Sequence, residues 1–101
     1  MKQGITYILS NKNRTVFYIG VTEDVVQRLY EHRYENGSEF TSKYNCFDLV
    51  YYETHDSMNA AIAREKQLKN WRREWKINLI NSINPEMVDL SEEVDSDPYP
   101  H

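Results

Sequence analysis

Short runs of β-branched and aromatic residues dominate the first part of the chain. Residues 4–10 (GITYILS) and 15–21 (TVFYIGV) are of this kind, and residues 11–13 (NKN) separate them. Two strand-like runs on either side of an asparagine-rich tip predict a β-hairpin. A later run of the same character, from residue 47 to residue 54, predicts a third strand.

Helical signals lie between and after these strands. Asp24 is a good capping residue for a helix that runs to about residue 35, with Gln27 in the capping-box position. Residues 36–38 (NGS) end this helix, and a loop through residues 41–44 leads to the third strand. A second helix is predicted over about residues 58–71.

The order of elements indicates a fold class. After residue 71 the helix continues or restarts through about residues 75–81, which gives the order β-β-α-β-α-α. This order predicts an α+β fold, in which a small three-stranded, mainly antiparallel sheet is flanked by helices.

The composition limits the classes of protein that remain. A chain of 101 residues fits one small domain. Its single cysteine, Cys46, excludes a disulfide framework and a cysteine-based zinc site. No apolar run approaches the roughly 20 residues of a membrane span, and the N-terminus lacks the layout of a signal peptide. We therefore expect a cytoplasmic protein with no membrane partner.

Charge divides the chain into two parts. Residues 1–84 hold all 12 Lys and Arg and 10 Asp and Glu, so their net charge is +2. Residues 85–101 hold six acidic residues, no basic residue and all three prolines, so their net charge is −6. Such a segment buries too little apolar surface to offset its ordering entropy. The sequence thus predicts a folded domain over residues 1–84 and a disordered acidic tail over residues 85–101.

Two tyrosines attract attention within the predicted hairpin. A hairpin whose loop is centred between residues 12 and 13 places Tyr7 opposite Tyr18, on one face of the sheet. The pair is either a stabilising aromatic contact or part of a site. Gly20, two residues after Tyr18, often marks the close approach of a ligand or of another backbone when it occurs in a strand.

The first predicted helix carries a polar pair beside its apolar stripe. Arg28 and His32 are four residues apart and so lie on one face, which Val25 and Leu29 share. An arginine stem commonly lies along apolar surface, which would make the pair structural. In a nuclease site, arginine supplies a permanent charge suited to phosphate and histidine supplies a proton carrier near neutral pH.

The second predicted helix combines a carboxylate on its inward stripe with a basic surface. Glu65 lies near Ala61 and Leu68 around the helix axis, where it is either paired with Lys69 or bound to a cation. Mg²⁺ is usually held by one or two carboxylates together with phosphate oxygens. The surrounding basic residues form either a solvated face or a surface that follows a phosphate backbone.

Taken together, these segments resemble the GIY-YIG nuclease superfamily, and within it the small single-domain proteins. The first motif appears in degenerate form as Ile5-Thr6-Tyr7, and the second is complete as Tyr18-Ile19-Gly20. Residues 28–32 (RLYEH) are similar to the family's helix with its arginine and histidine. Residues 64–71 (REKQLKNW) are similar to the helix that bears its metal-binding glutamate. The resemblance spans about residues 4–80.

The resemblance implies a metal-dependent endonuclease that hydrolyses DNA phosphodiester bonds. Tyr7 would act as general base or align the attacking water, and Tyr18 would position the scissile phosphate. Arg28 would stabilise its negative charge, and His32 would assist proton transfer or hold Tyr7. Glu65 would hold a single Mg²⁺ or Mn²⁺. The residues expected to contact nucleic acid are Lys43, Arg64, Lys69, Arg72 and Arg73.

The expected function is weakly sequence-specific DNA cleavage in repair or recombination, by a monomer or weak dimer that acts alone or with a repair or recombination protein. One alternative is a non-catalytic nucleic-acid-binding module of the same fold. Another is an interaction protein that uses the acidic tail. The complete set of five site residues favours the enzyme.

Overall fold

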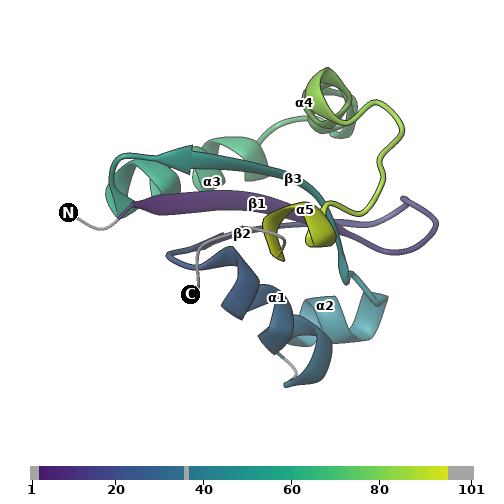
Figure 1. Ribbon diagram of the computed structural model, residues 1–101. Helices are drawn as coiled ribbons and strands as arrows, with labels where there is room; N and C mark the ends of the chain where they lie inside the picture. Colours follow the sequence, from purple (N-terminus) through teal and green to yellow (C-terminus); the bar gives the residue numbers. More distant parts are fainter. Residues whose placement is uncertain (1–2, 36, 96–101) are drawn as a thin grey trace.

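The computed structural model describes residues 3–35 and 37–95 and has an antiparallel sheet covered by helices on both faces (Figure 1). The strand order is β2-β1-β3, with β1 at Gly4–Ser10, β2 at Phe17–Thr22 and β3 at Asp48–His55. The helices are α1 (Val25–Tyr34), α2 (Glu39–Tyr44), α3 (Met58–Lys69), α4 (Arg73–Ile83) and α5 (Ser91–Asp95). The predicted α+β fold with a three-stranded antiparallel sheet is confirmed.

Alternation along β1 sends its side chains to two separate hydrophobic cores. Tyr7 and Leu9 pack under α1 with Val25 and Leu29. Ile8 packs on the opposite face, where the buried side chains come from β2, β3, α3 and α4. Figure 1 shows this layering, with α3 and α4 on one side of the sheet and α1 and α2 on the other. The central strand is therefore buried on both faces.

The hairpin register differs from the predicted one. Tyr7 lies opposite Gly20, and Tyr18 lies opposite Leu9. Ser10 of β1 and Phe17 of β2 form the pair next to the turn, because the connection between these strands is longer than predicted. Within it, the side-chain oxygen of Asn11 accepts hydrogen bonds from the backbone N–H groups of residues 15 and 16. The shift is by two residues, and since side chains alternate, Tyr7 and Tyr18 still share one face.

The segment predicted as a loop through residues 41–44 is the helix α2. Ser38 caps it by accepting a hydrogen bond from the backbone N–H of Thr41 at 3.2 Å. Asn45 ends it in the left-handed conformation, with φ of 56°. The helix is short and lacks a clear apolar period, so its sequence gave only the capping signal.

The acidic segment is ordered as far as residue 95, which differs from the prediction of a disordered tail from residue 85. The backbone N–H of Leu90 donates to the carbonyl oxygen of Leu49 at 2.7 Å, and Asp89 Oδ1 accepts from the backbone N–H of Leu49 at 3.0 Å. Leu90 and Val94 pack on the Tyr7 core. Apolar residues spaced between the acids thus hold the segment against β3. The remaining part of the predicted tail, residues 96–101, lies outside the described residues.

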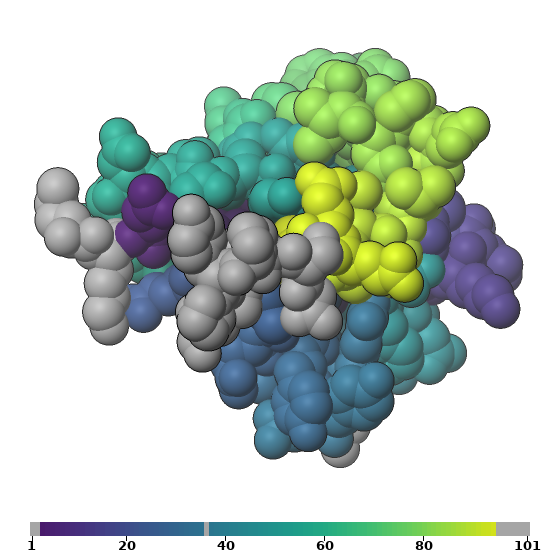
Figure 2. Space-filling view, in the orientation of Figure 1, coloured from purple at the N-terminus to yellow at the C-terminus, as the bar shows by residue number. Residues whose placement is uncertain are grey.

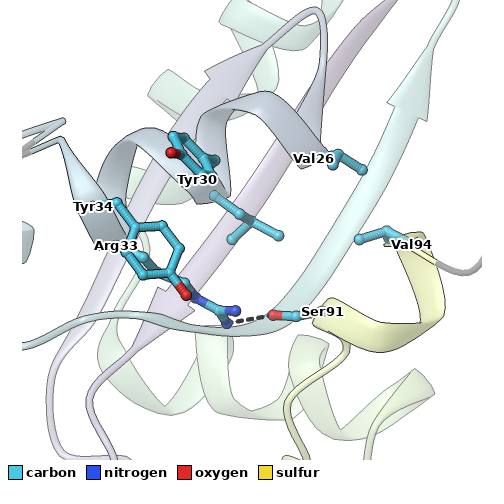
Figure 3. A pocket seen from close by; sticks show the side chains of 7 residues that line it. Val26, Tyr30, Arg33, Tyr34, Ser91 and Val94 are labelled. Carbon is cyan, nitrogen blue, oxygen red and sulfur yellow. Dashed lines mark hydrogen bonds between the residues drawn. The ribbon is translucent and has the colours of Figure 1, made fainter. Parts of the chain in front are cut away.

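The ordered acidic segment also contacts α1. Asp89 Oδ2 pairs with the Arg33 guanidinium at 3.1 Å, and Ser91 accepts a hydrogen bond from the same group. Figure 2 shows α5 at the surface between α4 and α1. A cavity of about 220 Å³ remains between α1 and α5, with Val26, Tyr30 and Val94 on its walls (Figure 3). Across the described residues, no helix has the length and apolar character needed to cross a membrane.

Substitution of Asp89 tests whether this segment is part of the folded domain. Asp89→Asn removes the charge that pairs with Arg33 and weakens the hydrogen bonds to Leu49 and Ser91. We expect the free energy of unfolding to fall by about 1–3 kcal/mol, as for a lost charged hydrogen bond, when measured by urea denaturation. Glu92→Gln, on the exposed side of α5, is the control and should leave stability unchanged. Equal stability of the two variants would contradict a structural role for residues 85–95.

The pKa of Asp89 lies below its usual range, and this shift gives a second measure of the same contacts. Burial raises this pKa, but the hydrogen bonds from Ser91 and Leu49 and the charge of Arg33 outweigh burial and lower it. The stability that Asp89 contributes is therefore present above the pKa of an unfolded aspartate and is lost as the pH falls through the folded-state value. The stability difference between Asp89→Asn and wild type should shrink at acidic pH.

Candidate active site

Tyr7 is the centre of a polar cluster that is buried between the sheet and α1. Its side chain is 1% exposed. The ring lies over Gly20 on the neighbouring strand, where an added Cβ atom would collide with the phenol oxygen of Tyr7 and crowd the ring of Tyr18. Tyr18 is half-buried, and its ring centroid is 6.3 Å from that of Tyr7. Glycine is thus required at this position because Tyr7 crosses the backbone of β2 there.

His32 on α1 joins Tyr7 to α2. Its Nε2 atom is 3.0 Å from the phenol oxygen of Tyr7, and its Nδ1 atom is 2.9 Å from Thr41 Oγ1. His32 and Thr41 are both almost fully buried. The edge of the imidazole ring faces Tyr18, with 5.4 Å between the ring centroids. Both ring nitrogens of His32 therefore have a hydrogen-bond partner inside the protein.

Arg28 lies one helical turn before His32 and reaches the same phenol oxygen. Its Nε atom donates to Tyr7 at 3.4 Å. The other guanidinium nitrogens donate to Glu31 Oε1 and to the carbonyl oxygen of Gly37, both at 3.1 Å. About a quarter of the Arg28 side chain is exposed. The guanidinium is thus fixed next to the phenol oxygen of Tyr7 and remains partly exposed.

Burial shifts the titration of this cluster strongly. It raises the pKa of Tyr7 to about 12, against the opposing effect of Arg28. Burial and the nearby charge of Arg28 lower the pKa of His32 to about 4. At neutral pH the cluster therefore holds a protonated phenol, a neutral imidazole and a charged guanidinium.

A groove of about 280 Å³ opens beside Tyr18 at the outer edge of β2. Two of its walls are basic, because Lys69 of α3 and Lys76 of α4 both line it. Apolar and aromatic side chains form the rest, with Phe17, Tyr18 and Ile19 from the strand and Phe40 from α2. The groove thus brings two lysines of α3 and α4 next to Tyr18.

Glu65 lies on α3, across the edge of the sheet from the tyrosine cluster. It pairs with Lys69 at 3.2 Å, so the predicted contact at i+4 is present, and 17% of its side chain is exposed. Because Lys69 lines the groove beside Tyr18, this pair adjoins the same opening. The structure thus brings Tyr7, Tyr18, Arg28 and His32 into contact, whereas Glu65 lies apart from them on α3 and is connected to the groove only through Lys69.

The other basic residues expected to contact nucleic acid differ in their surroundings. Arg64 bonds Glu53 at 2.6 Å and Gln67 at 2.7 Å, which ties it to β3. Lys43 is exposed on α2, over the ring of Tyr44. The two arginines at the start of α4 are exposed and lie over aromatic rings, Arg72 over Trp75 and Arg73 over Phe17.

Sequence reasoning missed three residues of this region. Thr41 gave no signal, because its role depends on a hydrogen bond to His32 across two helices. Phe40 stood in a segment predicted to be a loop. Lys76 belongs to the basic run of the last helices and could have been included on that ground.

Comparisons with known proteins agree with this arrangement. A family model described as the GIY-YIG catalytic domain matches residues 3–78. A UPF0213 protein of Syntrophus aciditrophicus is 34% identical over 89 residues, which is 87% of this chain and 100% of that protein. A UPF0213 protein of Haloquadratum walsbyi is 37% identical over 62 residues, 61% of this chain and 70% of that protein.

A solved structure has the same fold. The solution NMR structure of a UPF0213 protein from Bacillus halodurans matches with a TM-score of 0.55 and 26% identity, over 89% of this chain and 95% of that chain. The family model covers most of the chain, including both tyrosines, the α1 pair and Glu65. The chain therefore belongs to the GIY-YIG nuclease family.

Proposed function

We propose that this chain is a divalent-metal-dependent endonuclease that hydrolyses DNA phosphodiester bonds with little sequence specificity, in DNA repair or recombination. The observation that carries the proposal is the hydrogen bond of 3.0 Å between Tyr7 and His32, next to Arg28 and a lysine-lined groove. A phenol connected to a neutral imidazole is a route for a proton, and the surrounding cations suit a phosphodiester.

The hydrogen bonds assign the direction of this route. The hydroxyl of Thr41 donates to the carbonyl oxygen of Ser38 at 3.2 Å, so its oxygen accepts from His32. Nδ1 of His32 then carries the proton, and Nε2 is the acceptor. The phenol of Tyr7 consequently donates to Nε2. The chain of bonds runs from Tyr7 through His32 and Thr41 to the backbone.

The pKa values favour a relay over a stable tyrosinate. With a pKa of about 12, Tyr7 stays protonated at neutral pH. In a relay, the phenol oxygen accepts a proton from the attacking water while its own proton passes to Nε2 of His32. No free tyrosinate then forms, and the guanidinium of Arg28 balances the charge that develops on the phosphate.

The lysines explain why little sequence specificity is expected. Lys69 and Lys76 contact the groove from two different helices. Charged side chains that bind phosphates position a nucleic acid without reading its bases.

Glu65 suits a single-carboxylate metal site. Its carboxylate is partly exposed, and its partner Lys69 is 54% exposed, so the pair is worth less than about 1 kcal/mol and can open for a cation. The described residues contain no group of three or more His, Cys, Asp and Glu side chains that could hold a metal. Glu65 would therefore hold the ion with water and phosphate oxygens as the other ligands. A bound divalent cation supplies Lewis-acid stabilisation of the phosphate charge.

The first test concerns the protonation of His32. In ¹⁵N NMR spectra we expect Nδ1 to carry the proton and the ring to titrate with a pKa of about 4. Because this pKa lies below the unfolded value of about 6.5, the stability contribution of neutral His32 is lost as the pH falls from about 6.5 to about 4. For this one group, the slope of the free energy of unfolding against pH should reach at most about 1.4 kcal/mol per pH unit. Thr41→Val should remove the preference for the Nδ1 proton, whereas Thr54→Val, on the exposed part of β3, should not. A protonated Nε2 in the wild type would exclude the relay.

The second test removes only the hydroxyl of Tyr7. Tyr7→Phe should lower the cleavage rate by roughly two orders of magnitude or more, while DNA affinity measured in EDTA stays within about twofold, because the groove lysines remain. Tyr30→Phe, on the exposed side of α1, is the matched control. Equal rates for wild type and Tyr7→Phe would make the tyrosine pair purely structural.

The third test removes the carboxylate of Glu65. Glu65→Ala should abolish Mg²⁺- or Mn²⁺-dependent cleavage of branched DNA and the paramagnetic broadening by Mn²⁺ of NMR signals from α3. Stability should change by only about 0.5 kcal/mol, since the Lys69 end of the lost i,i+4 pair is exposed. Glu74→Ala on α4 makes the same charge change and should retain both properties. If wild type binds DNA and never cleaves it, the chain is the alternative non-catalytic binding module.

A further inference from the structure

A continuous row of aromatic rings leads from the tyrosine cluster to the surface of α2. The ring centroid of Phe40 is 5.9 Å from that of Tyr18 and 4.8 Å from that of Tyr44. Phe40 and Tyr44 are 41% and 40% exposed, and they lie on one face of α2 because they are four residues apart. We call Phe40 and Tyr44 the aromatic ridge.

The aromatic ridge is only partly buried, with Phe40 in contact with the ring of Tyr18. The buried side chain of this helix is Thr41, which bonds His32. Phe40 and Tyr44 instead leave large parts of their rings in contact with water, next to the opening of the groove. Exposed rings of this size beside a site indicate a binding surface rather than a core.

Three lysines lie near the aromatic ridge. The Lys43 ammonium lies 5.3 Å from the centre of the Tyr44 ring, and Phe40 shares the groove with Lys69 and Lys76. Lysines that alternate with exposed rings match a strand of nucleic acid, because phosphates pair with the charges while bases stack on the rings. This combination of groups does not suit a purely apolar peptide.

A second exposed aromatic pair lies in different surroundings from the aromatic ridge. Tyr30 and Tyr34 on α1 have ring centroids 5.0 Å apart and are 53% and 72% exposed. They border the cavity next to α5 (Figure 3). Asp89, just before α5, pairs with Arg33 of α1. This pair lies beside the acidic segment and is therefore unsuited to nucleic acid, which makes it a control.

From this juxtaposition we infer that the aromatic ridge stacks an unpaired base of the DNA substrate, next to the phosphate that enters the groove. The inference rests on the proposed function and specifies its substrate class, which is DNA with unpaired nucleotides beside the scissile bond. The bases of an intact duplex are already stacked on their neighbours, so a blunt duplex offers the ridge only its terminal pairs.

The test measures binding in EDTA, so it does not depend on cleavage. The probes are a duplex with a single-stranded overhang that contains a fluorescent purine analogue, and the same duplex with blunt ends. Phe40→Ala combined with Tyr44→Ala should weaken binding of the overhang probe by about tenfold or more and remove its fluorescence change. Binding of the blunt duplex should change by less than about twofold, since phosphate contacts remain.

Two controls separate stacking from loss of structure. Tyr30→Ala combined with Tyr34→Ala removes the other exposed pair and should leave both affinities unchanged. Phe40→Leu keeps an apolar side chain on α2, and it should weaken overhang binding while the NMR signals of His32 stay in place. Equal losses for both probes would overturn the inference. So would a dimer of the chain that dissociates in the Phe40→Ala, Tyr44→Ala variant, because the ridge would then be covered by a second copy.

The stacking inference and the proposed nuclease function can fail independently of each other. If the wild type cleaves DNA but shows no preference for the overhang in binding, the aromatic ridge has no stacking role. If it prefers the overhang through Phe40 and Tyr44 but never cleaves, the inference holds and the nuclease proposal fails.

Discussion

The burial of the Tyr7 hydroxyl is the constraint on which the rest of the site depends. A phenol on the central strand of a sheet needs a hydrogen-bond partner, because an unpaired buried hydroxyl costs about 1–3 kcal/mol. His32 supplies that partner from α1, and Gly20 supplies the space for the ring to cross β2. The imidazole in turn requires Thr41, so one buried group fixes the positions of two helices relative to the sheet. The same contacts that satisfy the core also form the connected hydrogen bonds on which the proposed proton relay rests.

Different side chains cover the two edges of the sheet. At the β3 edge, the acidic segment bonds Leu49 through its backbone and pairs Asp89 with Arg33. At the β2 edge, Lys69 and Lys76 line the groove beside Tyr18. The described acidic residues from Glu86 onward therefore do not line the groove.

Local patterns predicted the sheet, the main helices and two separate pairs of site residues, because periodicity and capping act over a few positions, and only the family resemblance joined the two pairs into one site. Helical spacing placed Arg28 and His32 on one face, and strand alternation placed both tyrosines together even though the register was wrong by two residues. What the sequence could not supply were contacts between distant segments. The ordered structure of residues 85–95 depends on hydrogen bonds to the backbone of β3. The role of Thr41 depends on where α1 packs. An argument from composition treats such a segment as disordered because it counts charges. It does not include the contacts that the folded domain makes with those charges.

The helix α2 links the chemistry to substrate recognition, since its two faces serve different purposes. The inward face presents Thr41, which sets the tautomer of His32, and the outward face presents Phe40 and Tyr44 beside the groove. Only six residues long, this helix has little stability of its own. Its position therefore depends on its Ser38 cap and on its bond to His32. A base stacked on the outward face would hold α2 against α1 and so restrict the motion of Thr41. In the proposed function, substrate contact and the geometry of the proton relay would then be coupled through one short element.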